Sequence, residues 1–180
     1  SITAIIAQTK KLKKMKNLDK RAILSKAIES LNQRVKSLGE SLTGTNSAIN
    51  DAPGAMQSHS DTTRSQLTAV VDVAHKAFND KVDELNLLRR FDSDNSTKLG
   101  PMTESRLGAI IVIQKKSTTN ENYFLLPGGS GIKIEYEGQK FICITPSSPL
   151  GMALLGKKKN ESFSLQVGSS IQQVKVLDIL

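Results

Sequence analysis

Hydrophobic residues recur along the first half of the chain at the alternating four- and three-residue steps of a helical seam. The first seam lies in a stretch from about Leu18 to Leu42 that no proline interrupts. Asp19 stands where a side chain can cap the first turn, and Gly39 is the weakest position, costing about 1 kcal/mol relative to alanine. The pattern predicts one long amphipathic helix. Its apolar seam consists of Leu24, Ile28, Leu31, Val35, Leu38 and Leu42.

A second seam with the same steps follows after a polar connection. Its members are Leu67, Val71, Ala74, Phe78, Lys81, Leu85 and Leu88. Lys81 is its one polar member, and the neighbouring Val82 can take its place. The connection, Thr43 to Ser60, is rich in Thr, Ser, Asn and Gly, with Pro53-Gly54 as its strongest turn signal. Two such helices joined in this way predict an antiparallel coiled-coil hairpin over residues 18–91 with an exposed tip.

After a polar linker, residues 92–104, the hydrophobic period changes from helical to strand-like. Between the fourth and fifth apolar runs, Ser148 to Lys158 reads SPLGMALLGKK, which predicts a short helix capped by Ser148 and closed by Gly156. Residues 105–180 are therefore predicted to form an α+β domain, a mostly antiparallel sheet of five or six strands with one short helix. The strand-like runs are Leu107–Ile113, Tyr123–Leu126, Ile132–Tyr136, Phe141–Thr145, Ser162–Val167 and Ile171–Ile179.

Charge and composition narrow the class of protein. The net charge is +8, but residues 1–17 hold five lysines and no acid, so the excess is mostly a basic tail. Such a tail can bind nucleic acid or remain a solvated terminus. The single cysteine, Cys143, lies in an apolar run and is interpreted as a buried thiol, which fits a reducing, cytoplasmic compartment. No apolar run approaches the roughly 20 residues of a membrane span, so no membrane association is expected.

The motifs YFLLPGG, at Tyr123 to Gly129, and SPLGMALLGKK, after a helical hairpin, resemble the Gre-type transcription elongation factors of the GreA/GreB family. The motifs carry the resemblance over residues 105–180, and the hairpin carries it by architecture only. It implies an FKBP-like fold for residues 105–180 and RNA polymerase as partner, with nucleic acid contacted only indirectly. It also implies a regulator that is not an enzyme and has no small-molecule substrate. The residues expected to contact the polymerase are Ser148, Pro149, Leu150, Gly151, Leu154, Leu155, Gly156 and Lys157.

The same resemblance directs attention to the hairpin tip. In the family the hairpin enters the secondary channel of the polymerase, where two tip acids, three residues apart, help hold a second catalytic Mg²⁺ for transcript cleavage. In this chain Asp61 matches the second acid, but Ser58 stands at the first, and Arg64 lies one turn beyond Asp61. Asp51 is a weaker candidate, and Asp61 equally suits a helix N-terminus. We therefore expect no metal site in this chain alone and favour channel occupancy without cleavage.

Two other classes of function stay open from the sequence. The lysine-rich tail suits a nucleic-acid- or ribosome-associated binding protein, and an FKBP-like fold also occurs in prolyl isomerases and chaperones. The low aromatic content, 4% of residues, leaves few rings to line an isomerase pocket. Lys157 to Lys159 can contact phosphate or simply complement the end of the short helix.

Overall fold

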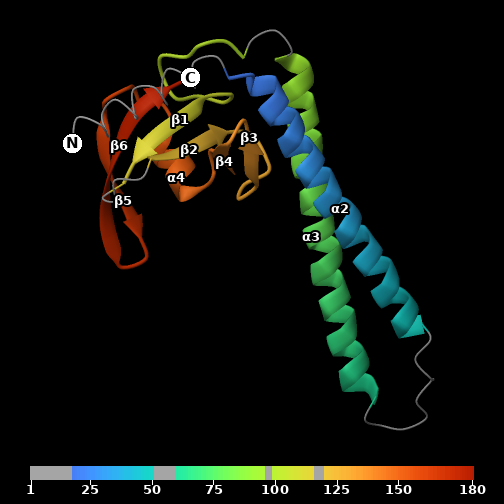
Figure 1. Ribbon diagram of the computed structural model, residues 1–180. Coiled ribbons are helices and arrows are strands. Elements are labelled where there is room, and N and C mark those ends of the chain that lie inside the picture. The colour runs from blue at the N-terminus through green and yellow to red at the C-terminus, as the bar shows by residue number, and fades with distance from the viewer. Residues whose placement is uncertain (1–17, 51–59, 96–98, 116–119) are drawn as a thin grey trace.

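The computed structural model describes residues 18–50, 60–95, 99–115 and 120–180, and not the side chains of residues 45–50, 60–67 and 167. Two long antiparallel helices, α2 (Lys20–Asn50) and α3 (Ser60–Asp94), precede a six-stranded sheet (Figure 1). The predicted α+β class, a helical hairpin followed by a sheet with one short helix, is confirmed. The remaining elements are β1 (Ile110–Gln114), β2 (Asn120–Leu125), β3 (Lys133–Tyr136), β4 (Gln139–Ile144), α4 (Pro149–Leu154), β5 (Ser162–Val167) and β6 (Ser170–Ile179).

The sheet is mostly antiparallel, as predicted. Its strand order is β3-β4-β2-β1-β6-β5, and the one parallel pair is β2 with β4. The pairing of β1 with β6 shifts register between Val112 and Ile113, where a bulge interrupts the ladder. Strands β1 and β2 are thus central, which agrees with the apolar runs Ile110–Ile113 in β1 and Tyr123–Leu125 in the second half of β2.

Both faces of the central strands are buried. Ile110 and Val112 of β1 belong to a core shared with the hairpin, whereas Ile111 and Ile113 belong to a core shared with α4. A strand buried on both faces needs apolar residues at every position, not at alternate ones. This requirement accounts for the uninterrupted run at β1.

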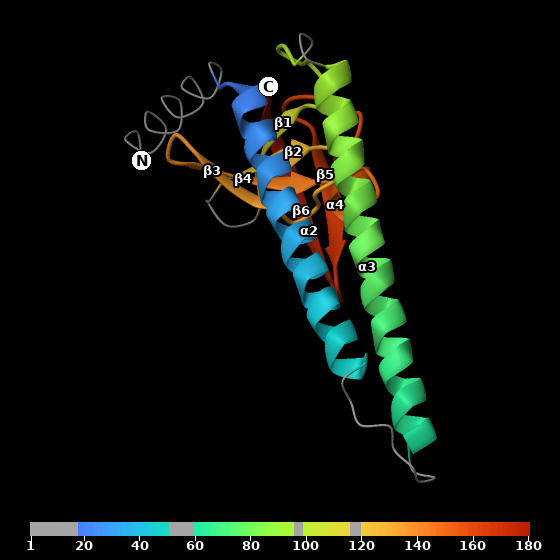
Figure 2. The ribbon, with the colours of Figure 1, turned by 90° about the vertical axis from the view of Figure 1, so that its right-hand side faces the viewer.

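The hairpin and α4 cover opposite faces of the sheet, so the molecule has three layers. Helices α2 and α3 lie side by side over one face (Figure 2). On the other face, Leu154 of α4 packs with Met102 and the second set of strand side chains. The hairpin residues buried in the first core are Ile23, Leu24, Ala27, Leu31, Leu85 and Leu88.

Three predicted boundaries need correction. Helix α2 continues to Asn50, so Thr43 to Asn50 is helix and not connection; no proline occurs before Pro53, and the Thr43 hydroxyl donates to the Gly39 carbonyl at 3.0 Å. Helix α3 reaches Asp94, inside the predicted linker. Strand β1 begins at Ile110 and not at Leu107, because Gly108 adopts φ +87°, which breaks the extended backbone. The turn signal Pro53-Gly54 lies outside the described residues.

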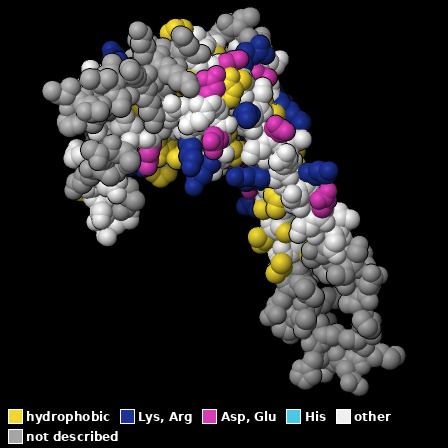
Figure 3. Space-filling view, viewed as in Figure 1, with side chains coloured by type: hydrophobic (Ala, Val, Ile, Leu, Met, Phe, Trp, Pro, Cys, Tyr) yellow, Lys and Arg dark blue, Asp and Glu magenta, His cyan; other side chains and the backbone are white. Residues whose placement is uncertain are grey.

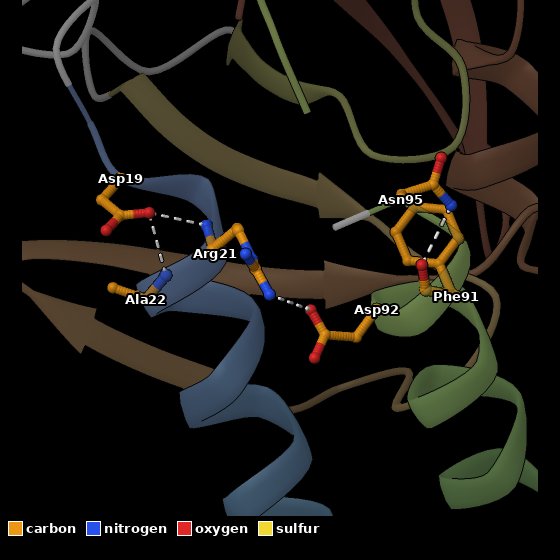
Figure 4. A network of polar contacts seen from close by, with 6 residues as sticks. All are labelled: Asp19, Arg21, Ala22, Phe91, Asp92 and Asn95. Carbon is orange, nitrogen blue, oxygen red and sulfur yellow. Dashed lines mark hydrogen bonds and ion pairs between the residues drawn. The ribbon is translucent and has the colours of Figure 1, made fainter. Parts of the chain in front are cut away.

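The hairpin is closed at its root by local polar contacts (Figure 4). Asp19 caps α2 as predicted, its Oδ1 accepting from the backbone N–H groups of Arg21 at 2.9 Å and Ala22 at 3.1 Å. The Arg21 guanidinium lies 3.8 Å from Asp92 Oδ1 of α3. Because both partners are partly exposed, this ion pair contributes at most about 1 kcal/mol. The apolar seam therefore carries most of the attachment between the helices.

The end of α3 is closed in a similar way. The side-chain amide and the backbone N–H of Asn95 both donate to the Phe91 carbonyl, at 2.9 and 3.1 Å (Figure 4). Farther along the hairpin, a Cβ on Gly39 would lie 3.2 Å from Phe78 Cε2. The glycine that weakens α2 by propensity thus makes room for an aromatic ring in the seam.

Candidate functional site

The motif SPLGMALLGKK forms α4 and the turn after it, with the predicted capping. Ser148 is the N-cap, and its Oγ accepts from the Gly151 N–H at 3.1 Å while its hydroxyl donates to the Thr145 carbonyl at 2.7 Å. Pro149 occupies the first turn, where its missing N–H is no loss. Gly156 adopts φ +76° just beyond the helix, the left-handed conformation that a closing glycine provides.

Gly151 meets a steric requirement that its backbone angles do not reveal. A Cβ at this position would lie 1.9 Å from the Thr145 carbonyl oxygen. The chain entering α4 therefore passes directly against the helix, and only a residue without a side chain allows this approach. Gly151 shapes the element and is itself buried.

Ser105 anchors the end of α4 from a distant part of the chain. Its side chain is 1% exposed, its hydroxyl contacts the Leu154 and Lys157 carbonyls, and its N–H donates to the Lys157 carbonyl at 2.8 Å. The Gly156 N–H in turn donates to the Ser105 carbonyl at 2.8 Å. These bonds satisfy backbone groups at the helix end that would otherwise be orphaned. Sequence reasoning missed Ser105, because nothing local to it marks its partner.

The predicted contact residues differ in exposure, and Ser148, Leu150 and Lys157 are half-buried. Gly151 and Leu154 are buried, so they support the helix and do not offer contact area. Leu155 is 51% exposed, and Pro149 is exposed as well. Met152, which was not among the predicted contacts, is 61% exposed one turn from each of them. We call Pro149, Met152 and Leu155 the α4 surface.

The lysines that follow α4 are largely engaged within the protein. Lys157 Nζ lies 3.6 Å from Glu161 Oε2 and 6.0 Å from the Phe163 ring centroid. Lys159 Nζ donates to the buried Asp178 Oδ1 at 2.7 Å. These contacts favour a structural role for both lysines over phosphate binding.

The motif YFLLPGG ends in a loop that packs directly on α3. The Gly129 N–H donates to Glu84 Oε2 at 2.9 Å, and Lys81 Nζ lies 2.5 Å from Glu84 Oε1. A Cβ on Gly128 would come within 2.7 Å of the Glu84 carbonyl oxygen. The loop is thus a joint between the sheet and the hairpin, and its glycines permit the close approach.

The tip residues named from the sequence are not placed by the structure. Asp61 belongs to the first turn of α3, but its side chain is outside the description, and Asp51 and Ser58 lie outside the described residues. In the part of the chain that is described, no group of three or more His, Cys, Asp or Glu side chains could hold a metal ion. The tip acid Asp61 and the weaker candidate Asp51 therefore remain predictions from the sequence.

The structure also bears on the predicted burial of Cys143 and on the membrane-spanning potential of the helices. Cys143 is buried in the core beneath the hairpin, and burial raises the pKa of its thiol to about 12, as expected of an inert core thiol. Across residues 18–50, 60–95, 99–115 and 120–180, the model contains no helix long and apolar enough to cross a membrane.

Comparison with known proteins identifies the carboxy-terminal domain. Residues 103–180 match the family described as transcription elongation factor, GreA/GreB, C-term. This match confirms the resemblance drawn from the two motifs, and residues 103–180 form a GreA/GreB carboxy-terminal domain. No curated protein sequence matches the chain.

Solved structures of related factors align with the chain at low identity. Gfh1 of Thermus aquaticus aligns over 84% of this chain and 92% of its own, with 15% identity and a TM-score of 0.35. Gfh1 of Thermus thermophilus aligns over 85% and 94%, with 15% identity and a TM-score of 0.34. The GreA/GreB factor of Nitrosomonas europaea aligns over 41% and 57%, with 16% identity and a TM-score of 0.31. At these TM-scores the superpositions do not bear on function.

Proposed function

We propose, from the premise that residues 103–180 form a GreA/GreB carboxy-terminal domain, that this chain binds RNA polymerase and regulates transcript elongation. The sheet domain docks on the polymerase, and the hairpin reaches into its secondary channel. Any chemistry on the transcript belongs to the polymerase. The observation that carries the proposal is the family motif itself, which presents the α4 surface to solvent on a firmly anchored helix.

The α4 surface has the properties of a protein contact. Met152 and Leu155 are 61% and 51% exposed although both are large and apolar. Their backbone is held by the Ser148 cap and by Ser105, so docking would order little that is not already ordered. An exposed apolar group on a rigid element is a common centre for binding energy.

The hairpin has the reach that a channel-inserting arm needs. Leu31 is the last fully buried residue of α2 in the shared core, and α2 runs on to Asn50. At 1.5 Å per residue this projection is about 28 Å long. Figure 3 shows the arm standing clear of the sheet domain, with Lys and Arg side chains gathered near the junction. Leu42, 8% exposed, continues the seam along the projecting part.

The tip sequence supports occupancy of the channel without stimulation of cleavage. A second Mg²⁺ prefers several hard oxygen ligands, and paired carboxylates on the arm would help supply them. This chain has Asp61 but carries Ser58 at the other position, and a neutral hydroxyl is a poor substitute for a carboxylate. We therefore assign the factor to the class of competitors or modulators of the channel.

Docking is tested by charge substitution on the α4 surface. Met152→Asp and Leu155→Asp should each weaken binding to core RNA polymerase at least tenfold, because docking would bury an uncompensated carboxylate. Ile171→Asp, at a 65% exposed apolar position next to the β5–β6 turn, is the matched control and should bind normally. The affinity of each variant for immobilised core RNA polymerase is measured, with the full chain and with a chain that lacks residues 1–14. Normal binding by both α4 variants would refute docking through α4.

The cleavage assignment is tested on backtracked elongation complexes. The wild-type chain and Asp61→Ala should leave transcript cleavage at the level of the polymerase alone. Ser58→Asp, which restores two acids three residues apart, should raise the cleavage rate, whereas Ser58→Asn should not. Strong stimulation by the wild-type chain that Asp61→Ala abolishes would contradict the assignment.

A further inference from the structure

A cavity of about 500 Å³ lies where three distant segments of the chain meet. The first turn of α2, the segment Leu99 to Met102 and the end of β6 come together there, at the upper edge of the molecule in Figure 1. Its volume falls within the roughly 300–1,000 Å³ of small-molecule sites. The described residues that line the cavity include none from the hairpin tip or from α4, so neither proposed polymerase contact accounts for it.

The wall of the cavity is aliphatic apart from two charged side chains. The described residues that line it include no aromatic ring, so they offer no face on which a planar ligand could stack. The charged members are Lys20 and Asp178. The apolar members are Leu18, Leu99, Pro101, Met102, Ile179 and Leu180.

Lys20 is buried, and no carboxylate among the described residues pairs with it. Its side chain is 7% exposed, and its Nζ donates to the Gly100 carbonyl at 2.8 Å, which uses one of its three protons. Asp178, the acid in the same wall, is already paired with Lys159 at 2.7 Å. Among the described residues, Lys20 forms an ion pair with none. A buried ammonium ordinarily has an opposite charge beside it.

The electrostatic surroundings of Lys20 are positive. Burial, together with the neighbouring Arg106 guanidinium, lowers the pKa of the Lys20 ammonium to about 8. The Lys20 ammonium is therefore mostly protonated at pH 7, although burial destabilises its charged form. An anion placed beside it would offset that destabilisation. Asp178 is paired with Lys159, and the positive charge of Arg106 further disfavours the charged form of Lys20.

We propose that this cavity binds an aliphatic monocarboxylate, with the carboxylate against Lys20 and the hydrocarbon chain along the Leu99, Met102 and Ile179 side of the wall. The carboxylate supplies the anion that the buried ammonium lacks. The chain matches an aliphatic wall without aromatic rings. Since the lining comes from α2, the linker segment and β6, the ligand also bridges the hairpin and the sheet.

The proposal is tested by calorimetric titration of the full chain at pH 7 with sodium octanoate. One molecule should bind per chain, and Lys20→Met, which removes the charge but keeps an unbranched side chain of similar size, should weaken binding at least tenfold. Arg106→Gln should weaken it a few-fold, because Arg106 acts only through its field. Lys26→Met, on the exposed side of the next turn of α2, is the matched control and should bind like the wild type.

Two further ligands test the hydrocarbon chain and the carboxylate separately. 1-Octanol tests the chain without the charge, and acetate tests the charge without the chain; both should bind at least tenfold more weakly than octanoate. Met152→Asp should leave octanoate binding unchanged, which excludes the exposed α4 surface as the binding site. Absence of octanoate binding, or equal binding by wild type and Lys20→Met with both folded by circular dichroism, would overturn the proposal. None of these readouts involves RNA polymerase.

Discussion

At the scale of single residues, the most demanding position is Gly151. Its importance comes from the carbonyl of Thr145, not from the left-handed backbone angles that glycines usually provide. Ser148 lies beside this contact, where its hydroxyl donates to the Thr145 carbonyl and its Oγ accepts from the Gly151 N–H. The three residues together fix how the chain turns into α4.

Gly151→Ala should destabilise the protein by about 3 kcal/mol or more. The added Cβ would lie 1.9 Å from a backbone oxygen, so the chain entering α4 must move. Gly44→Ala is the matched control, because it lies in exposed helix with no atom within 4 Å of its Cβ. It should be neutral or stabilise by up to about 1 kcal/mol. Urea unfolding measures both, and equal stabilities would show that the entry to α4 relaxes freely.

At the scale of elements, the joint between α3 and the loop after β2 links the hairpin to the sheet. Glu84 is central to it, accepting from the Gly129 N–H at 2.9 Å and pairing with Lys81. Gly129 is buried, so its N–H depends on that carboxylate. The joint thus adds a polar contact to the apolar core that the hairpin shares with the sheet.

Glu84→Ala should cost about 1–3 kcal/mol, since it leaves a buried N–H without its acceptor. Lys81→Ala removes only a partly exposed ion pair and should cost less than about 1 kcal/mol. The Gly129 amide should exchange with deuterium faster in Glu84→Ala than in Lys81→Ala. Indistinguishable losses of stability and exchange rates in the two variants would show that Glu84 does not hold the loop.

At the scale of the whole molecule, the sheet supports a helical layer on each face, and one of these layers extends beyond it. The root of the hairpin shares one core with the sheet, α4 shares the other, and the outer part of the arm projects past both (Figures 1 and 2). The hairpin and α4 therefore pack on opposite faces of the same sheet.

Much of this arrangement was predictable from the sequence, because the signals involved are local. The two seams predicted the hairpin, and Asp19, Ser148 and Gly156 predicted helix ends that the structure confirms. Predicted boundaries failed where polar residues continued a helix, as at Thr43 to Asn50. Exposed helix positions place no hydrophobic requirement on the sequence, so periodicity does not mark where the helix stops.

The sequence by itself determined the order of the elements, their apolar faces and the family of the carboxy-terminal domain. Only the tertiary structure decided that Ser105 bonds the carbonyls at the end of α4 and that Glu84 accepts from the Gly129 N–H. It also decided that Lys20 lies in an aliphatic cavity. These contacts join residues 49, 45 and 80 positions apart. Hydrophobic periodicity reports which side of an element faces inward, whereas the partner of a buried polar group depends on which distant backbone arrives beside it.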